Sequence, residues 1–184
     1  MRTDPPIPGT LPPKLAELFE AIETVRAETL GLVLAAADAG APSLPAGAWT
    51  APELLEHLLL SEISAGKVVR KVLRESGASL PPYPSDDSGL RIRQPVSFDG
   101  MEAPPAARPT GAPTRETLMS QAADVRASTL ETLRMLSAVD PGAGVFPHHR
   151  FGSLNLYEWL AIVILEHEKA HRPQLQAAIA GGRP

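Results

Sequence analysis

The chain has 184 residues, a formal net charge of −4 and no cysteine. This length fits one domain with a sizeable core, and lysine and arginine are spread too evenly for a surface that binds nucleic acid or an anionic membrane. The lack of cysteine excludes disulfides, thiolate metal ligands and a cysteine nucleophile. No stretch reaches the roughly 18 apolar residues of a membrane span, and the N-terminus lacks the apolar core of a signal peptide. We therefore expect one cytoplasmic domain over 1–184, flexible over 1–12.

The first predicted helix runs from about Pro13 to Ala37. The residues of one stripe recur at steps of three and four, which is typical of an amphipathic helix. They are Leu15, Leu18, Phe19, Ile22, Val25, Thr29, Leu32 and Val33. Gly40, Pro42 and Pro45 follow this stretch and predict its end.

A capping signature marks the start of the second predicted helix. Thr50 can accept a hydrogen bond from the first turn, and Glu53, three residues later, can accept one from the Thr50 backbone. The helical periodicity continues to about Ser76, where Gly77 predicts the end of the helix.

The segment 77–113 separates the second and third predicted helices and has almost no hydrophobic periodicity. It contains eight prolines, Pro81, Pro82, Pro84, Pro95, Pro104, Pro105, Pro109 and Pro113. Prolines at this density predict an ordered loop over the surface. Because a connection of this length usually crosses from one end of a bundle to the other, we expect the helices on either side of it to be parallel.

Two further helices complete the predicted fold. Thr114 caps the third, which extends to Asp140 and is followed by a short Gly-rich loop. The fourth repeats the capping signature with Asn155 and Glu158 and reaches about Ala180. Four helices, scarcely any β-patterned alternation and one long crossover predict an all-α four-helix bundle.

Three histidines lie on the apolar stripes of two of these helices. His167 and His171 are four residues apart, hence about 40° apart around the axis and about 6 Å along it, so both imidazoles can reach one ion. His57 lies on the inward stripe of the second helix. We therefore predict that His57, His167 and His171 bind one divalent metal ion. The alternative is that each is a buried imidazole satisfied by an ordinary hydrogen bond. Burying an imidazole without any partner costs roughly 1–3 kcal/mol, and coordination of a shared ion would remove that cost for all three.

The sequence from His167 to His171 also matches the H-E-x-x-H motif of zinc metalloproteases, in which the glutamate is the general base. Those enzymes generally take a third ligand downstream, but only 13 residues follow His171, and none is His, Asp or Glu. We therefore favour the three-histidine site over a protease. Glu168 is left with three possible roles, facing solvent, contacting an adjacent helix, or supporting a ligand.

Four other residues near the predicted site have open roles. His148 and His149 precede the fourth helix, and we expect them to be solvent-exposed or at the rim of the site, not ligands. Glu53 could support a ligand one turn away, although its capping role already explains it. Gln174 could contact a ligand or simply pack between helices. No catalytic residue is fixed by spacing.

Three motifs, in this order and spacing, resemble the DinB-like superfamily. They are Trp49-Thr50-Ala51-Pro52-Glu53 leading to His57, then Phe151-Gly152-Ser153-Leu154, then His167-x-x-x-His171-x-x-Gln174. The resemblance implies an up-down-down-up bundle, a homodimer, and zinc or nickel held by His57, His167 and His171. Pro173, two residues after the last ligand, departs from a regular helix and predicts a bend.

Three imidazoles leave at least one coordination position open, as in catalytic zinc sites. An ion held this way can lower the pKa of bound water toward about 7 or activate a thiolate. Since similar DinB-like proteins use low-molecular-weight thiols, our leading hypothesis is a metal-dependent thiol S-transferase, or a hydrolase, acting on a small molecule. The alternative is a non-catalytic, metal-binding dimeric module with a structural or stress-related role.

Overall fold

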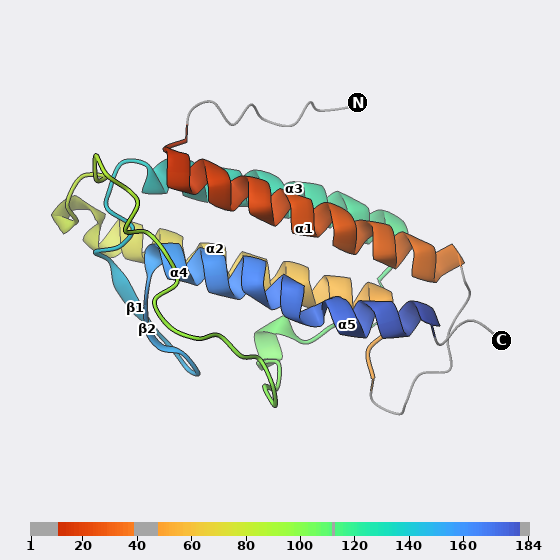
Figure 1. Cartoon of the computed structure of the whole chain (residues 1–184). Coiled ribbons are helices and arrows are strands. Elements are labelled where there is room, and N and C mark those ends of the chain that lie inside the picture. The colour runs from red at the N-terminus through yellow and green to blue at the C-terminus, as the bar shows by residue number, and fades with distance from the viewer. Residues whose placement is uncertain (1–10, 39–47, 112, 181–184) are drawn as a thin grey trace.

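The structure, a computed structural model, describes residues 11–38, 48–111 and 113–180 (Figure 1). Its helices are α1 (Pro13–Asp38), α2 (Ala51–Ser76), α3 (Arg115–Leu136), α4 (Leu156–Leu160) and α5 (His167–Ala180). A π-helical segment, Ala161–Glu166, joins α4 to α5, and we call these three pieces together the last helix. Two 3-10 turns, Gly77–Ser79 and Pro105–Ala107, and two strands, β1 (Val145–His148) and β2 (Gly152–Asn155), complete the elements of the described residues. None of the described helices is long and apolar enough to cross a membrane.

The helices lie side by side, with α1 and the last helix running in one direction and α2 and α3 in the other (Figure 1). This order agrees with the up-down-down-up path that the resemblance implied. The crossover between α2 and α3 runs from one end of the helices to the other, which leaves these two helices parallel, as predicted. The last helix, taken over its whole length, packs extensively against both α2 and α1, and α2 packs to a similar extent against α3.

The expectation of a purely α fold is wrong at one place, where a β-hairpin replaces the predicted Gly-rich loop. The strands β1 and β2 are antiparallel and pair Val145 with Asn155 and His148 with Gly152. Strands of four residues are too short to give a clear alternation, and Pro147 cannot donate to a ladder, so the sequence pattern was weak. The indole Nε1–H of Trp159 donates to the Phe146 carbonyl at 3.0 Å and ties the hairpin to the last helix.

Most predicted helix ends are observed. Both capping boxes form, with Thr50 bonded to Glu53 and Asn155 to Glu158. By contrast, α3 ends at Leu136 and not at Asp140, because the chain leaves the helix to meet the crossover. Pro173 lies within α5 and does not end it. Residues 1–10 of the expected flexible segment and the three predicted breakers after α1, Gly40, Pro42 and Pro45, lie outside the described residues.

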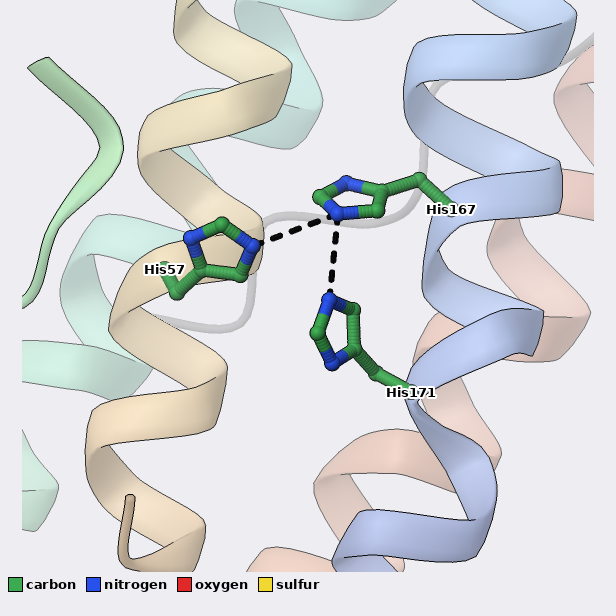
Figure 2. A group of neighbouring side chains, drawn as sticks. All are labelled: His57, His167 and His171. Carbon is green, nitrogen blue, oxygen red and sulfur yellow. Dashed lines mark hydrogen bonds between the residues drawn. The ribbon is translucent and has the colours of Figure 1, made fainter. Parts of the chain in front are cut away.

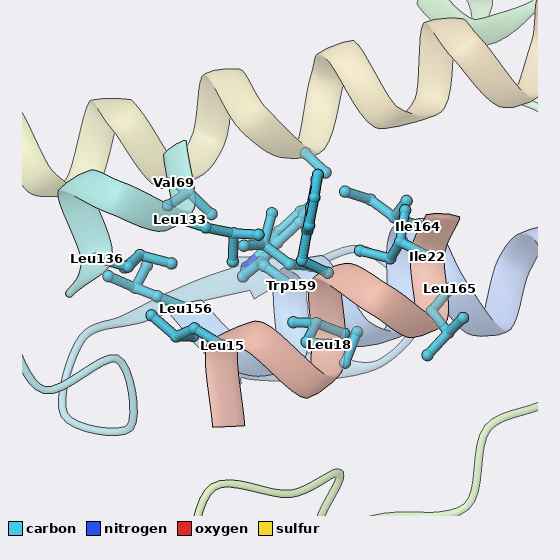
Figure 3. Packing of buried hydrophobic residues seen from close by; sticks show 14 of the residues in the cluster. Leu15, Leu18, Ile22, Val69, Leu133, Leu136, Leu156, Trp159, Ile164 and Leu165 are labelled. Carbon is cyan, nitrogen blue, oxygen red and sulfur yellow. The ribbon is translucent and has the colours of Figure 1, made fainter. Parts of the chain in front are cut away.

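The main core fills the space between the four helices (Figure 3). Its fully buried side chains include Leu15 of α1, Leu133 of α3 and Leu160 of the last helix. Trp159 lies within this cluster and is 7% exposed. Burial of these apolar side chains supplies the main driving force for packing.

Two buried carboxylates hold the crossover onto the helices. Glu56 of α2, 6% exposed, accepts hydrogen bonds from the backbone N–H and the hydroxyl of Thr110. Glu158, 1% exposed, accepts from the backbone N–H of Arg93 at 3.0 Å and from its guanidinium at 2.6 and 3.0 Å. The proline-rich crossover is thus an ordered part of the fold, fixed at two separate points.

Candidate metal centre

The three predicted histidines come together between two helices (Figure 2). The Nε2 atom of His167 lies 3.2 Å from Nε2 of His57 and 3.1 Å from Nε2 of His171. One ring nitrogen from each residue lies within 4.8 Å of the other two. Zinc–nitrogen bonds of about 2.0–2.1 Å place tetrahedral ligands about 3.3 Å apart, so this spacing fits one ion. We call His57, His167 and His171 the histidine cluster.

The crossover fixes the ring of His57. Its Nδ1–H donates to the Ala107 carbonyl at 2.7 Å, so the neutral ring has its lone pair on Nε2. The side chain is 3% exposed, and Trp49 packs against it with ring centroids 4.9 Å apart. Burial lowers the pKa of His57, so the ring is neutral at pH 7.

The π-helical segment fixes the ring of His167. The backbone N–H of His167 bonds to the Ile162 carbonyl, five residues back, and so does not use the Val163 carbonyl that a regular α-helix would offer. That carbonyl accepts a hydrogen bond from the His167 imidazole. Burial, and then the neighbouring imidazoles, lower the pKa of His167 to about 3. The irregular helix therefore supplies the group that orients a predicted ligand.

The third ring, that of His171, is oriented by its own helix. Its Nδ1 bonds to the side-chain oxygen of Gln174, one turn further along. An amide oxygen only accepts, so Nδ1 carries the proton and Nε2 faces the other two rings. Burial lowers the pKa of His171, while the Gln174 bond and the charge of Glu168 oppose this shift. Of the two open roles for Gln174, contact with the predicted ligand is the one observed.

Three neutral imidazoles thus direct their Nε2 lone pairs toward one another, with Nε2 of His167 only 3.2 and 3.1 Å from those of His57 and His171. Acceptors packed this closely repel unless a cation or a shared proton lies between them. Each ring also has the hydrogen bond on its other nitrogen that is typical of metal-ligating histidines. The residues present therefore fit a divalent ion, and the donor set of three imidazoles suits zinc, nickel and similar metals.

Glu168 is buried and pairs with a residue of α1, so it does not face solvent. Its carboxylate, 2% exposed, forms two parallel bonds with Arg26 of α1, each 2.9 Å long. The same guanidinium bonds to Glu62 of α2 at 2.8 Å, and Glu62 accepts a further bond from Thr129 of α3. We call Arg26, Glu62 and Glu168 the ion triad. The described structure assigns Glu168 this structural role, and it is not a general base facing the histidine cluster.

A pocket of about 480 Å³ opens onto the histidine cluster. Its walls are largely apolar and aromatic, with polar groups from the hairpin and the crossover; they include Trp49, Val68, Phe98, Met101, Trp159 and Val163. Phe98 packs against the His167 ring with centroids 4.8 Å apart. A concave apolar pocket with a few convergent polar groups is the usual form of a small-molecule site.

The remaining predicted residues divide between the site and the fold. His148 and His149 both line the pocket, but His148 is 9% exposed and buried, whereas His149 is exposed. Glu53 bonds only to Thr50 among the described contacts, so its capping role accounts for it.

Sequence reasoning missed three residues that matter here. Ala107 acts through its backbone carbonyl, and Phe98 comes from a segment without periodicity, so neither has a side-chain signal that spacing could reveal. Arg26 did have one, because it lies at helical spacing among the apolar stripe residues of α1. A charged residue at such a position predicts a buried partner of opposite charge.

No match was found among curated proteins or among solved structures. A family model described as the DinB superfamily matches residues 21–175, which include the whole histidine cluster. Because this match covers far more than half of the chain, the chain belongs to the DinB superfamily.

Proposed function

We propose that this protein is a metal-dependent enzyme whose divalent ion, zinc or nickel, is held by His57, His167 and His171. The observation that carries the proposal is that three oriented, neutral imidazoles meet at the wall of a pocket large enough for a small molecule. A purely structural site would be closed by a fourth protein ligand. Among the described residues, no further histidine or carboxylate joins the group.

The protein's own residues hold and shield this site. Hydrogen bonds from the rings to Ala107, Val163 and Gln174 keep each Nε2 aimed inward, which raises the basicity of the ligands and fixes their geometry. Trp49 and Phe98 pack on two of the rings and keep bulk water from their faces. A divalent ion bound there supplies Lewis acidity, which acidifies a coordinated water molecule or thiol.

The finer proposal is that the second substrate is a low-molecular-weight thiol, transferred to an electrophile. Two points support it: the family resemblance and the mixed apolar and polar pocket. The lack of any cysteine in the chain is compatible with an external thiol. A hydrolase that uses the acidified water is the competing reaction at the same site. The homodimer expected from the resemblance is part of the proposal, and light scattering of the metal-loaded protein measures it.

Elemental analysis of protein purified without an affinity tag tests the metal site. We expect about one ion per chain in the wild type and its loss in His57→Ala. His149→Ala, which removes an exposed histidine from the same pocket, serves as the matched control and should retain the ion. Equal metal in wild type and His57→Ala, or none in the wild type after dialysis against zinc or nickel, would contradict the proposed site.

Cobalt(II) substitution separates an enzyme from a closed binding module. In the cobalt protein, a small thiol such as 2-mercaptoethanol should produce a sulfur-to-cobalt charge-transfer band, because the pocket leaves a position for it. The band should be lost in His57→Ala and kept in His149→Ala. If adding a thiol produces no charge-transfer band in the cobalt protein, the non-catalytic alternative is favoured. If the band forms, screening thiols against electrophiles follows.

A further inference from the structure

His148, the last residue of β1, has a fixed tautomer. Its Nδ1 accepts hydrogen bonds from the backbone N–H groups of Arg150 at 3.2 Å and Phe151 at 3.3 Å. A nitrogen that accepts from two amides carries no proton, so the neutral ring has its proton on Nε2. Burial, and then His149, lower the pKa of His148 to about 4, which keeps the ring neutral at pH 7. The His148 ring therefore offers one hydrogen-bond donor, its Nε2–H, while its only acceptor, Nδ1, is already in use.

The His148 side chain forms part of the pocket wall. The ring stacks on Phe151 with centroids 4.9 Å apart and packs on Trp159 at 5.1 Å, which leaves the residue 9% exposed. His148 lines the pocket that holds the histidine cluster, and no hydrogen bond from its Nε2–H to any described residue is found. The Nε2–H donor has no partner among the described residues and is available to an acceptor in the pocket.

This donor lies away from the histidine cluster. Its neighbour Trp159 precedes His167 by eight residues on the last helix, which is about 12 Å along the axis. Between them, Val163 and the α2 residues Ser61 and Val68 line the same pocket. The pocket therefore reaches from the histidine cluster to His148 on the hairpin, which is near enough to contribute to the lowered pKa of His167.

The charges around the pocket restrict what the donor can bind. Among the described residues that line it, none is lysine or arginine, while Asp99 and Glu102 of the crossover are acidic. The nearby Arg150 guanidinium is engaged by the backbone carbonyls of Ser97 and Asp99. A carboxylate or phosphate held here would lack a counter-charge and would be repelled by the acidic side chains.

We propose that His148 donates from Nε2–H to an uncharged oxygen, such as an amide or ketone carbonyl, of an extended small molecule whose metal-binding end lies at the histidine cluster. This substrate class deepens the proposed function and rests on it. The apolar walls between the two ends contact the body of the molecule. His148 thus selects the substrate by its far end, separately from the metal.

Hydroxamic acids of matched chain length test this on the zinc-loaded protein. The hydroxamate group binds zinc, and the other end is a primary amide, an isopropyl group of the same shape, or a carboxylate. Isothermal titration should show the amide binding about fivefold more tightly than the isopropyl compound, as one net hydrogen bond implies, and the carboxylate binding least tightly. Zinc content is measured in the same samples.

His148→Asn is the informative variant, because its side-chain oxygen can accept the same two backbone amides while lacking the Nε2–H donor. We expect the amide preference to vanish in His148→Asn and to persist in the control His149→Asn, with one zinc bound per chain in both. Equal binding of amide and isopropyl compounds by the wild type, a preference that survives in His148→Asn, or tightest binding of the carboxylate would overturn the inference alone. No binding of any hydroxamate would overturn the open metal position and the inference with it.

Discussion

Two clusters of three polar side chains both use residues of α2 and α5, and the ion triad also includes Arg26 of α1. They differ in whether each polar atom has a partner within the protein. In the ion triad, one guanidinium lies between two carboxylates, and each of the four carboxylate oxygens accepts a hydrogen bond from Arg26 or Thr129. In the histidine cluster, each ring has a partner on its outer nitrogen only, and the inner nitrogens face one another as acceptors. The difference distinguishes a structural cluster from a binding site. A cluster whose polar atoms pair with one another holds helices together, whereas a cluster with several unpaired acceptors facing one point needs a ligand.

The largest expected effect comes from breaking the closed cluster. Arg26→Met leaves two carboxylates buried without a cation, so the free energy of unfolding of the metal-free protein should fall by about 3–5 kcal/mol in urea denaturation. Arg134→Met is the control, since it removes an ion pair with Glu131 whose side chains are 44% and 63% exposed, worth less than about 1 kcal/mol.

A triple variant sharpens this test. Replacing the ion triad by Met, Leu and Leu at 26, 62 and 168 should recover most of the lost stability, because a well-packed apolar set avoids the cost of burying charge. If Arg26→Met costs no more than Arg134→Met, the ion triad is not the structural element that we describe.

The open cluster should respond to metal where the closed one does not. Zinc at a hundredfold excess over its Kd should raise the free energy of unfolding by about 2.7 kcal/mol. His57→Ala should lose this gain, and His149→Ala should keep it, as followed by circular dichroism during urea titration. A similar gain in His57→Ala would mean that zinc stabilises the protein at some other place.

The free energy of unfolding of the metal-free protein should fall at acid pH, because protonation of the histidine cluster favours the unfolded state. His167 has a pKa of about 3 in the folded protein and about 6.5 when unfolded, so the unfolded state binds the proton more tightly. Its stabilising contribution is present above pH 6.5 and is lost as the pH falls toward 3, with a slope of at most about 1.4 kcal/mol per pH unit. Urea denaturation between pH 6.5 and 4.5 measures how the free energy of unfolding changes with pH. This slope should be shallower in His167→Leu than in the wild type, by up to that amount. Equal slopes in the two proteins would show that this ring does not titrate in this way.

The smallest effect concerns the partner of one ring. Gln174→Ala removes the acceptor that orients His171, so zinc affinity should fall about 10- to 100-fold while urea denaturation of the metal-free protein changes little. Gln176→Ala, an exposed glutamine on the same helix, is the control. Competition with a chromophoric chelator measures both affinities, and equal affinities would assign Gln174 no role at the site.

The positions of the histidine cluster were predictable because helices convert sequence spacing into direction. Residues His167 and His171 project from one face at four-residue spacing, and the apolar stripe around His57 defines which face turns inward. The same reasoning located the two capping boxes and the crossover. These features depend on side chains within one element, which is the range over which sequence patterns are informative.

What the sequence did not reveal depends on backbone groups or on contacts between distant segments. The Ala107 carbonyl reaches His57 only because the crossover folds across α2, and the β-hairpin needs two short strands to meet. The π-helical segment contains Ala161, Ile162, Val163, Ile164, Leu165 and Glu166, with neither glycine nor proline to mark it. Nothing in its residue types distinguishes it from an ordinary buried helix.

The π-helical segment also changes the rotation about the axis of the last helix, so that α4 and α5 present different faces to their neighbours. Before it, α4 presents Trp159 to the core and the hairpin; after it, α5 presents its histidines to α2. Deleting a single residue within 161–166 could restore regular α-helical bonding, but it would rotate one half against the other by about 100°. Either Trp159 would then lose its contact with the hairpin or the two histidines would turn away from α2. The length of this segment is therefore fixed, and even one residue cannot be removed, although its apolar side chains are interchangeable.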